Sequence, residues 1–112
     1  MYGVNELDVQ SLKTRLDNGE AIRLVDVRSA EEYQQGIIAG GEFLPLHTLP
    51  THLDDFSADE TIIFYCRSGQ RSAQACAFLK ENKAIEATNL RGGIIAWYQA
   101  GYEIVAPQTD GT

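Results

Sequence analysis

A cysteine between a hydrophobic run and a helix-forming segment is the most chemically suggestive feature of this sequence. The stretch "TIIFYCRSGQRSAQACAFLKEN" covers residues 61–82, and Cys66 ends its β-branched and aromatic run. Arg67, Gly69 and Arg71 follow closely. The thiolate is the nucleophilic form of cysteine, and cations or the N–H groups of a helix start stabilise it. Lowering a thiol pKa by about two units needs roughly 2.7 kcal/mol of such stabilisation. We therefore expect Cys66 to be an activated nucleophile.

The elements around Cys66 should place it at an edge of a sheet. Residues 61–66 show almost no polar alternation, which is typical of a strand buried on both faces of a parallel sheet. Residues 70–82 have a helical composition, and ligand sites in such folds form beyond the carboxyl ends of the strands. Gly69 lets the backbone bend so that successive N–H groups converge. The pattern predicts a bowl of amide donors with the Cys66 sulfur at its base, suited to an anionic reaction partner.

The other elements alternate between helix and strand, which favours an α/β fold with a parallel sheet. Asn5 as N-cap and Gly19 as stop predict a helix within residues 3–20. Ser29 and Glu32 form the pattern of a capping box, which predicts a short helix directly after Arg28. The remaining expected elements are strands at 22–27, 42–46 and 87–90, a helix within 49–56 begun by Pro50, a helix at 92–101 closed by Gly101, and a frayed segment at 102–112.

Length and composition indicate one globular domain. The 112 residues are 44% hydrophobic and 22% charged, and we assign residues 1–105 to a single domain and 106–112 to a flexible tail. No apolar run is long enough to cross a membrane, and the N-terminus lacks the pattern of a signal peptide. The net charge of −7 argues against nucleic-acid binding. We expect neither a membrane nor a nucleic acid as partner.

The cysteine and histidine content gives no sign of a metal site or a disulfide scaffold. The chain has only two cysteines and two histidines, without metal-binding spacing. Cys76 lies among alanines in mid-helix, where we expect it to pack in the core. His47 and His52 receive no role. We expect no cofactor and a reducing, cytoplasmic location.

Three motifs in order resemble those of the rhodanese-like sulfurtransferases. The stretch "CRSGQRS" at 66–72 resembles the family's active-site loop. The stretch "LVDVRSAEEYQQG" at 24–36 resembles its upstream motif, and "LRGGIIAW" at 90–97 resembles its downstream motif. Together they span about 75 residues. The resemblance implies a single domain with a three-layer fold, in which helices cover both faces of a five-stranded parallel sheet.

The resemblance also implies a thiosulfate sulfurtransferase that works in two steps without a cofactor. The Cys66 thiolate would take the outer sulfur of an anionic donor such as thiosulfate and become a persulfide. Cyanide, a small thiol or a thiol protein would then accept that sulfur. Arg67 and Arg71 would hold the donor's sulfonate or stabilise the charge of the persulfide. Asp26 and Arg28 would support the loop, unless they form only a structural ion pair. The backbone N–H groups that would cradle the sulfur belong to Ser68, Gly69, Gln70, Arg71 and Ser72.

One loop departs from the family pattern. The family usually has Gly-His-Ile-Pro-Gly-Ala after the upstream motif, but residues 36–41 read "GIIAGG". Ile37 replaces the histidine and Ala39 the proline. The histidine is not the family's sulfur carrier, so the departure bears on the shape of the loop and the choice of substrate.

Other functions remain open at this point. A persulfide carrier or docking module that delivers sulfur to a protein partner would use the same fold, although docking modules of the family commonly lack the cysteine. An arsenate reductase or a cysteine phosphatase would also place a thiolate over amides. Loops of the tyrosine-phosphatase type have five residues between cysteine and arginine, whereas four separate Cys66 from Arg71. The sequence therefore favours sulfur transfer.

Overall fold

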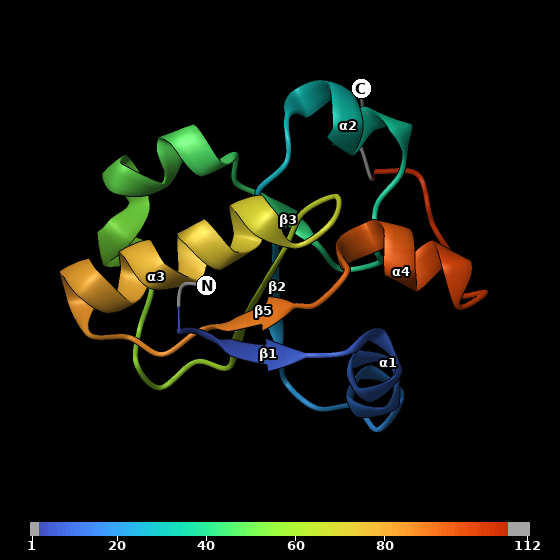
Figure 1. Ribbon diagram of the computed structural model, residues 1–112, viewed down its shortest axis with the longest axis horizontal. Helices are drawn as coiled ribbons and strands as arrows, with labels where there is room; N and C mark the ends of the chain where they lie inside the picture. The colour runs from blue at the N-terminus through green and yellow to red at the C-terminus, as the bar shows by residue number, and fades with distance from the viewer. Residues whose placement is uncertain (1–2, 108–112) are drawn as a thin grey trace.

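The computed structural model describes residues 3–107, and its centre is a five-stranded sheet in which all neighbouring strands run parallel (Figure 1). The strand order is β1-β5-β4-β2-β3. The strands are β1 (Asn5–Leu7), β2 (Arg23–Asp26), β3 (Glu42–Phe43), β4 (Ile62–Tyr65) and β5 (Thr88–Leu90). The expected α/β fold is confirmed.

Helices cover both faces of the sheet. They are α1 (Val9–Asp17), α2 (Ala30–Gln35), α3 (Gln70–Lys83), α4 (Gly93–Gln99) and the 3₁₀ helix η1 (Leu46–Asp55). Figure 1 shows α1 and α4 on one side of the sheet and α3 with η1 on the other. Side chains alternate along the central strands, as the pleat of a strand requires. Phe64 packs in the core under α3 and η1, whereas Ile63 and Tyr65 pack in the core under α1 and α4.

The first strand corrects the expected helix over residues 3–20. Asn5 does not cap a helix; it begins strand β1, which pairs with β5 at the edge of the sheet. Asp8 is the N-cap of α1, and its carboxylate accepts a 2.8 Å hydrogen bond from the N–H of Ser11. Gly19 ends the helical segment with a φ of +76°, as expected. The propensity of residues 5–7 is overridden by pairing with a strand far along the chain.

The segment after α4 is also more ordered than expected. Ile37 and Val105 form an antiparallel bridge with N–H to carbonyl distances of 2.8 and 2.9 Å. The indole N–H of Trp97 donates to the carbonyl of Glu103 at 2.9 Å, and the ring of Tyr102 packs against it. Residues 102–105 are therefore not frayed. Most of the expected tail, residues 108–112, lies outside the described residues.

Two smaller points complete the fold. The helical segment expected from Pro50 begins earlier, at Leu46, and is a 3₁₀ helix with Pro50 inside it. The capping box of Ser29 and Glu32 is present at the start of α2, as expected. Of the helices in residues 3–107, none combines the length and the apolar character needed to cross a bilayer.

Candidate active site

Cys66 lies between the end of β4 and the start of α3, and its sulfur is surrounded by hydrogen-bond donors. The residue is 1% exposed. Its Sγ accepts hydrogen bonds from the N–H of Gly69 at 3.1 Å, the N–H of Ser72 at 3.4 Å and the hydroxyl of Ser72 at 3.3 Å. Gly69 is the N-cap of α3 and has a φ of +107°, in the left-handed region that favours glycine. The loop therefore forms a bowl of donors with the sulfur at its base.

These donors set the protonation of the thiol. Burial raises the pKa of Cys66, but hydrogen bonds from the hydroxyl and N–H of Ser72 and from the N–H groups of Gly69 and Ser68 outweigh it and lower the pKa below its ordinary value. The donors that lower the pKa are thus amides and a hydroxyl of the loop itself. At Cys76 burial is the largest cause and raises the pKa to about 12. Cys76 packs in the core, as expected.

The backbone of the loop is oriented by β5 and by the segment that follows it. The carbonyl of Cys66 accepts from the N–H of Ile94 at 2.9 Å, and the carbonyl of Arg67 accepts from the N–H of Ile95 at 3.1 Å. The carbonyl of Gly69 accepts from the side-chain amide of Asn89 at 3.1 Å. With these carbonyls turned toward β5 and α4, N–H groups of the same loop face the sulfur. This is how a short stretch of backbone becomes an anion-binding nest.

Gly93 allows this close approach. An added Cβ at Gly93 would lie 2.4 Å from the carbonyl oxygen of Arg67 and 2.6 Å from that of Cys66. Gly92 and Gly93 both have positive φ, at +81° and +61°. The double glycine in "LRGG" was part of a family motif in the sequence, but its physical purpose is visible only when α4 lies against the loop.

The side chain of Arg71 is bound to a residue of helix α2. Its guanidinium donates to the two carboxylate oxygens of Glu32 at 2.7 and 3.0 Å. Glu32 also accepts from the N–H and hydroxyl of Ser29 in the capping box, at 3.1 and 3.0 Å. The hydrogen bonds from Arg71 are the largest cause of a fall in the pKa of Glu32 to about 2, which burial opposes and Ser29 reinforces. Arg71 therefore ties α2 to α3, and its expected contact with the donor's sulfonate stays a prediction.

Glu32→Gln should reveal this tie as a pH-dependent loss of stability. The folded pKa lies below the unfolded value, so the stabilisation is present above about pH 5 and is lost as the pH falls toward 2. We expect the variant to be less stable than the wild type by about 1 kcal/mol near neutral pH and the difference to vanish near pH 2. Denaturant titrations at several pH values measure it. Glu31→Gln, on the same turn of α2, is the control; an equal, pH-independent loss in both variants would contradict the assignment.

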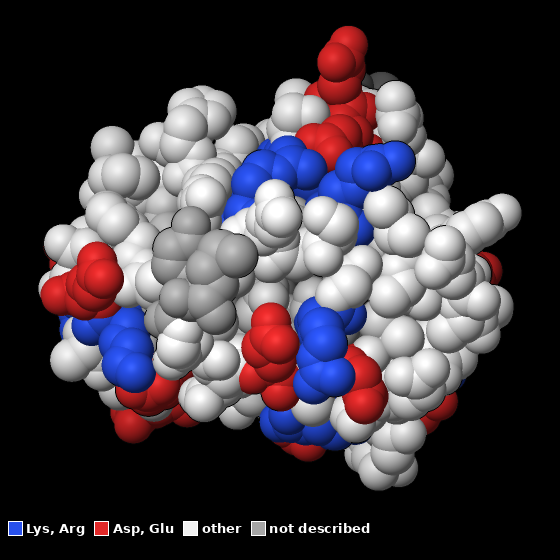
Figure 2. Space-filling view, viewed as in Figure 1, with Lys and Arg blue, Asp and Glu red and all other residues white. Residues whose placement is uncertain are grey.

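Arg67 is exposed, unlike Arg71. Within residues 3–107, its side chain has no ion-pair or hydrogen-bond partner. It lines a groove of about 370 Å³ between α2 and α4, together with Arg28, Ile95 and Tyr98. Tyr98 is 68% exposed and belongs to the rim, while Trp97 is buried in the core. Figure 2 shows basic side chains gathered beside the acidic side chains of α2.

Asp26 and Arg28 form a buried ion pair, but the pair contacts another segment than the active-site loop that was expected. Their side chains are 0% and 6% exposed, and Arg28 Nη2 lies 2.7 Å from Asp26 Oδ2. The same nitrogen donates to the carbonyl of Gly36 at 2.7 Å. The polar contacts of the pair thus hold the chain at Gly36 and do not reach residues 66–72. Here Ile37, which stands where the family has histidine, is buried and pairs with Val105.

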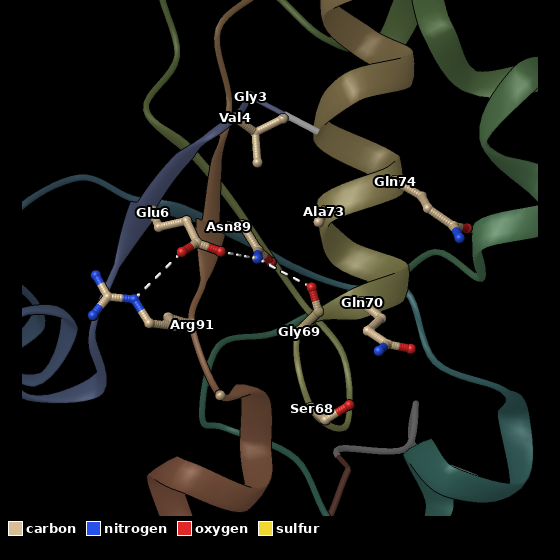
Figure 3. A pocket seen from close by; sticks show the side chains of 11 residues that line it. Gly3, Val4, Glu6, Ser68, Gly69, Gln70, Ala73, Gln74, Asn89 and Arg91 are labelled. Atoms are coloured by element: carbon tan, nitrogen blue, oxygen red, sulfur yellow. Dashed lines mark hydrogen bonds and ion pairs between the residues drawn. The ribbon is translucent and has the colours of Figure 1, made fainter. Parts of the chain in front are cut away.

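A second cavity, of about 450 Å³, lies on the other side of the loop between β1 and α3. Figure 3 shows Ser68 and Gln70 at its edge, and a chain of polar contacts from Arg91 through Glu6 and Asn89 to Gly69. Sequence reasoning assigned no role to Glu6 or Asn89. The one feature of the sequence that could have pointed to Asn89 is its polar amide side chain within the short predicted strand "ATNL".

Comparison with known proteins agrees with this architecture. The family described as "Rhodanese-like domain" matches residues 8–100. A sulfurtransferase from Allochromatium vinosum is 46% identical over 105 residues, which cover 94% of this chain and 98% of that protein. A rhodanese-like domain protein from Staphylococcus aureus has a TM-score of 0.83 at 31% identity, covering 94% of this chain and 100% of the other. A thiosulfate sulfurtransferase from Pseudomonas aeruginosa has a TM-score of 0.82 at 25% identity, covering 95% of this chain and 21% of that longer one.

Proposed function

The chain belongs to the family of rhodanese-like domains, and from this premise we propose that it is a sulfurtransferase that carries sulfur as a persulfide on Cys66. The observation that carries the proposal is the set of N–H and hydroxyl donors 3.1–3.4 Å from a buried thiol whose pKa is lowered. A thiolate formed in this way is a nucleophile at neutral pH without a general base. The sulfurtransferase similar to this chain over nearly its whole length supports the same reaction class.

The reaction proceeds by two displacements at sulfur. In the first, the Cys66 thiolate attacks the outer sulfur of thiosulfate, the S–S bond of thiosulfate breaks, and sulfite leaves with the electron pair. Cys66 then carries a persulfide anion, whose charge the same donors stabilise. In the second, an acceptor such as cyanide or a thiolate attacks the outer sulfur, the new S–S bond breaks, and the Cys66 thiolate is restored. Because Cys66 must be reduced, a reducing compartment such as the cytoplasm suits the reaction.

Thiosulfate as donor is supported by Arg67. Its guanidinium has no partner among residues 3–107 and lies next in sequence to Cys66, whereas Arg71 is held by Glu32. A charge-assisted contact with a sulfonate group is among the stronger hydrogen bonds. The thiosulfate sulfurtransferase with a similar fold is consistent with this donor.

Arg67→Ala should weaken the use of thiosulfate while leaving the thiol unchanged. We expect kcat/KM for thiosulfate to fall roughly tenfold, mainly through KM, because one charge-assisted contact is lost. Alkylation of Cys66 by iodoacetamide, which is uncharged, should proceed at nearly the wild-type rate. Arg15→Ala, which removes a partly exposed arginine of α1, should use thiosulfate normally. Mass spectrometry follows the alkylation, and thiocyanate formation from cyanide follows the turnover. Equal losses of thiosulfate turnover and of alkylation would contradict a role for Arg67 in binding the donor.

Delivery of the sulfur to a protein thiol is the second candidate, and the groove between α2 and α4 favours it. A protein acceptor needs room beside the persulfide, and the exposed Tyr98 and the neighbouring Ile95 offer it a partly apolar surface. If this reading holds, Tyr98→Ala slows transfer to a protein thiol and leaves transfer to cyanide unchanged.

Cysteine phosphatase and arsenate reductase chemistry fits the site less well. In both, the arginine that closes the loop binds an oxyanion above the thiolate, but Arg71, the arginine in that part of this loop, is bound by Glu32. The donors of the loop lie within hydrogen-bond distance of the sulfur itself. A loop of this kind suits one extra sulfur atom better than a tetrahedral oxyanion.

A further inference from the structure

Asn89 is a buried amide beneath the active-site loop. It lies on β5 and is 1% exposed. Its Nδ2 donates to the carbonyl of Gly69 at 3.1 Å and to a carboxylate oxygen of Glu6 at 3.0 Å (Figure 3). Glu6 is the register partner of Asn89 on β1, so the two side chains lie on the same face of the sheet, under the start of α3. Asn89 thus links the edge of the sheet to the loop that holds Cys66.

The orientation of this amide is determined by its partners. Both partners of Nδ2 are acceptors, so turning the amide over would place its oxygen against two other oxygens. In the present orientation Oδ1 is buried and has no hydrogen-bond partner among residues 3–107. A buried carbonyl without a partner destabilises a fold, and a native structure that keeps one usually does so for a functional reason. An apolar side chain at this position of the strand would remove that cost.

Gly69 connects Asn89 to the sulfur. The N–H of Gly69 donates to Cys66 Sγ, and its carbonyl accepts from Asn89. The carbonyls of Cys66 and Arg67 are held by backbone N–H groups of α4. Gly69 lacks a side chain that could restrict its backbone, and beyond the helical bond from Ala73 its carbonyl is held from outside α3 by the amide of Asn89. The Asn89 side chain therefore controls how the backbone of Gly69 is turned.

We propose that Asn89 is a positioning residue that keeps the N–H of Gly69 directed at the Cys66 sulfur. It acts through Gly69 and contacts neither the sulfur nor the substrate. Its removal leaves the fold of the sheet intact and raises the pKa of the thiol, because one of the donors that stabilise the thiolate is no longer held in place. The inference deepens the proposed function, but it concerns the reactivity of the thiol and can be tested without any sulfur donor.

The test is the pH dependence of Cys66 alkylation by iodoacetamide in Asn89→Ala. The matched control is Asn82→Ala, which removes an equivalent bond from an asparagine Nδ2 to a backbone carbonyl, here that of Phe78 at 2.8 Å on the exposed side of α3. All proteins carry Cys76→Ala, so that Cys66 is the thiol whose alkylation is measured. We expect the midpoint of the profile to rise by about half to one pH unit in Asn89→Ala, which is a threefold to tenfold loss of thiolate at pH values well below the parental midpoint. Asn82→Ala keeps the parental midpoint.

The outcomes separate this inference from the proposed function. A parental midpoint in folded Asn89→Ala would overturn the role of Asn89, whether or not the protein transfers sulfur. If the variant does not fold, the side-chain NH₂ signals of Asn89 in the wild-type protein give the answer by NMR. They should shift with pH at the midpoint of Cys66, while those of Asn82 stay constant; signals of Asn89 that do not respond would equally overturn the proposal.

Discussion

Replacing Gly93 with alanine is expected to destabilise the protein by about 3 to 5 kcal/mol and to displace the active-site loop. The new Cβ would lie 2.4 Å from the carbonyl oxygen of Arg67 and 2.5 Å from its carbon, and both belong to backbone that no rotamer change can move. The φ of +61° adds strain of its own. Since a misplacement of about 1 Å can cost on the order of a hundredfold in rate, sulfur transfer should fall by at least that factor.

Gly101→Ala separates the clash of the added Cβ from the strain of the positive φ. Gly101 follows the same helix and has a φ of +86°, but nothing lies within 4 Å of an added Cβ. We expect it to lose only about 1 to 2 kcal/mol, the cost of the left-handed conformation, and to transfer sulfur normally. Denaturant unfolding and thiocyanate formation measure both effects. If the two variants were equally stable, contact between α4 and the loop would not be what requires a glycine at position 93.

The second large effect is expected from Cys66→Ala. Sulfur transfer should fall by about a thousandfold or more, because no other residue of the loop can carry the sulfur. Cys76→Ala, on the helix α3 that follows Cys66, is the matched control. It removes a buried thiol whose pKa is raised to about 12, so it should lose some stability but keep its turnover. Substantial turnover in Cys66→Ala would show that the sulfur passes through another group.

The part of the site that could be predicted from the sequence is the part that is local. A buried strand, a cysteine, a glycine and a helix follow one another directly, so the chain itself brings Cys66 to the N–H groups of residues 69 and 72. The capping box at Ser29 is local in the same way. For such features the hydrogen-bond partners lie within a few residues, and their types are visible in the sequence.

The parts that could not be predicted depend on contacts between distant segments. Residues 5–7 have a helical pattern, but pairing with β5 makes them a strand. Arg71 was expected to face the donor because nothing in the sequence shows that Glu32 lies beside it. Asn89 received no role for the same reason, since its bond to Gly69 spans 20 residues of chain. In each case the sequence specifies the side chain, and the packing of the layers selects its partner.

Intact mass after incubation with thiosulfate tests the central claim most directly. The reduced protein should gain about 32 Da, the mass of one sulfur atom, and cyanide should remove it again. Cys76→Ala should gain the same mass and Cys66→Ala none. A folded, reduced wild-type protein that gains no mass, or a gain that persists in Cys66→Ala, would contradict the proposal that Cys66 takes sulfur from thiosulfate.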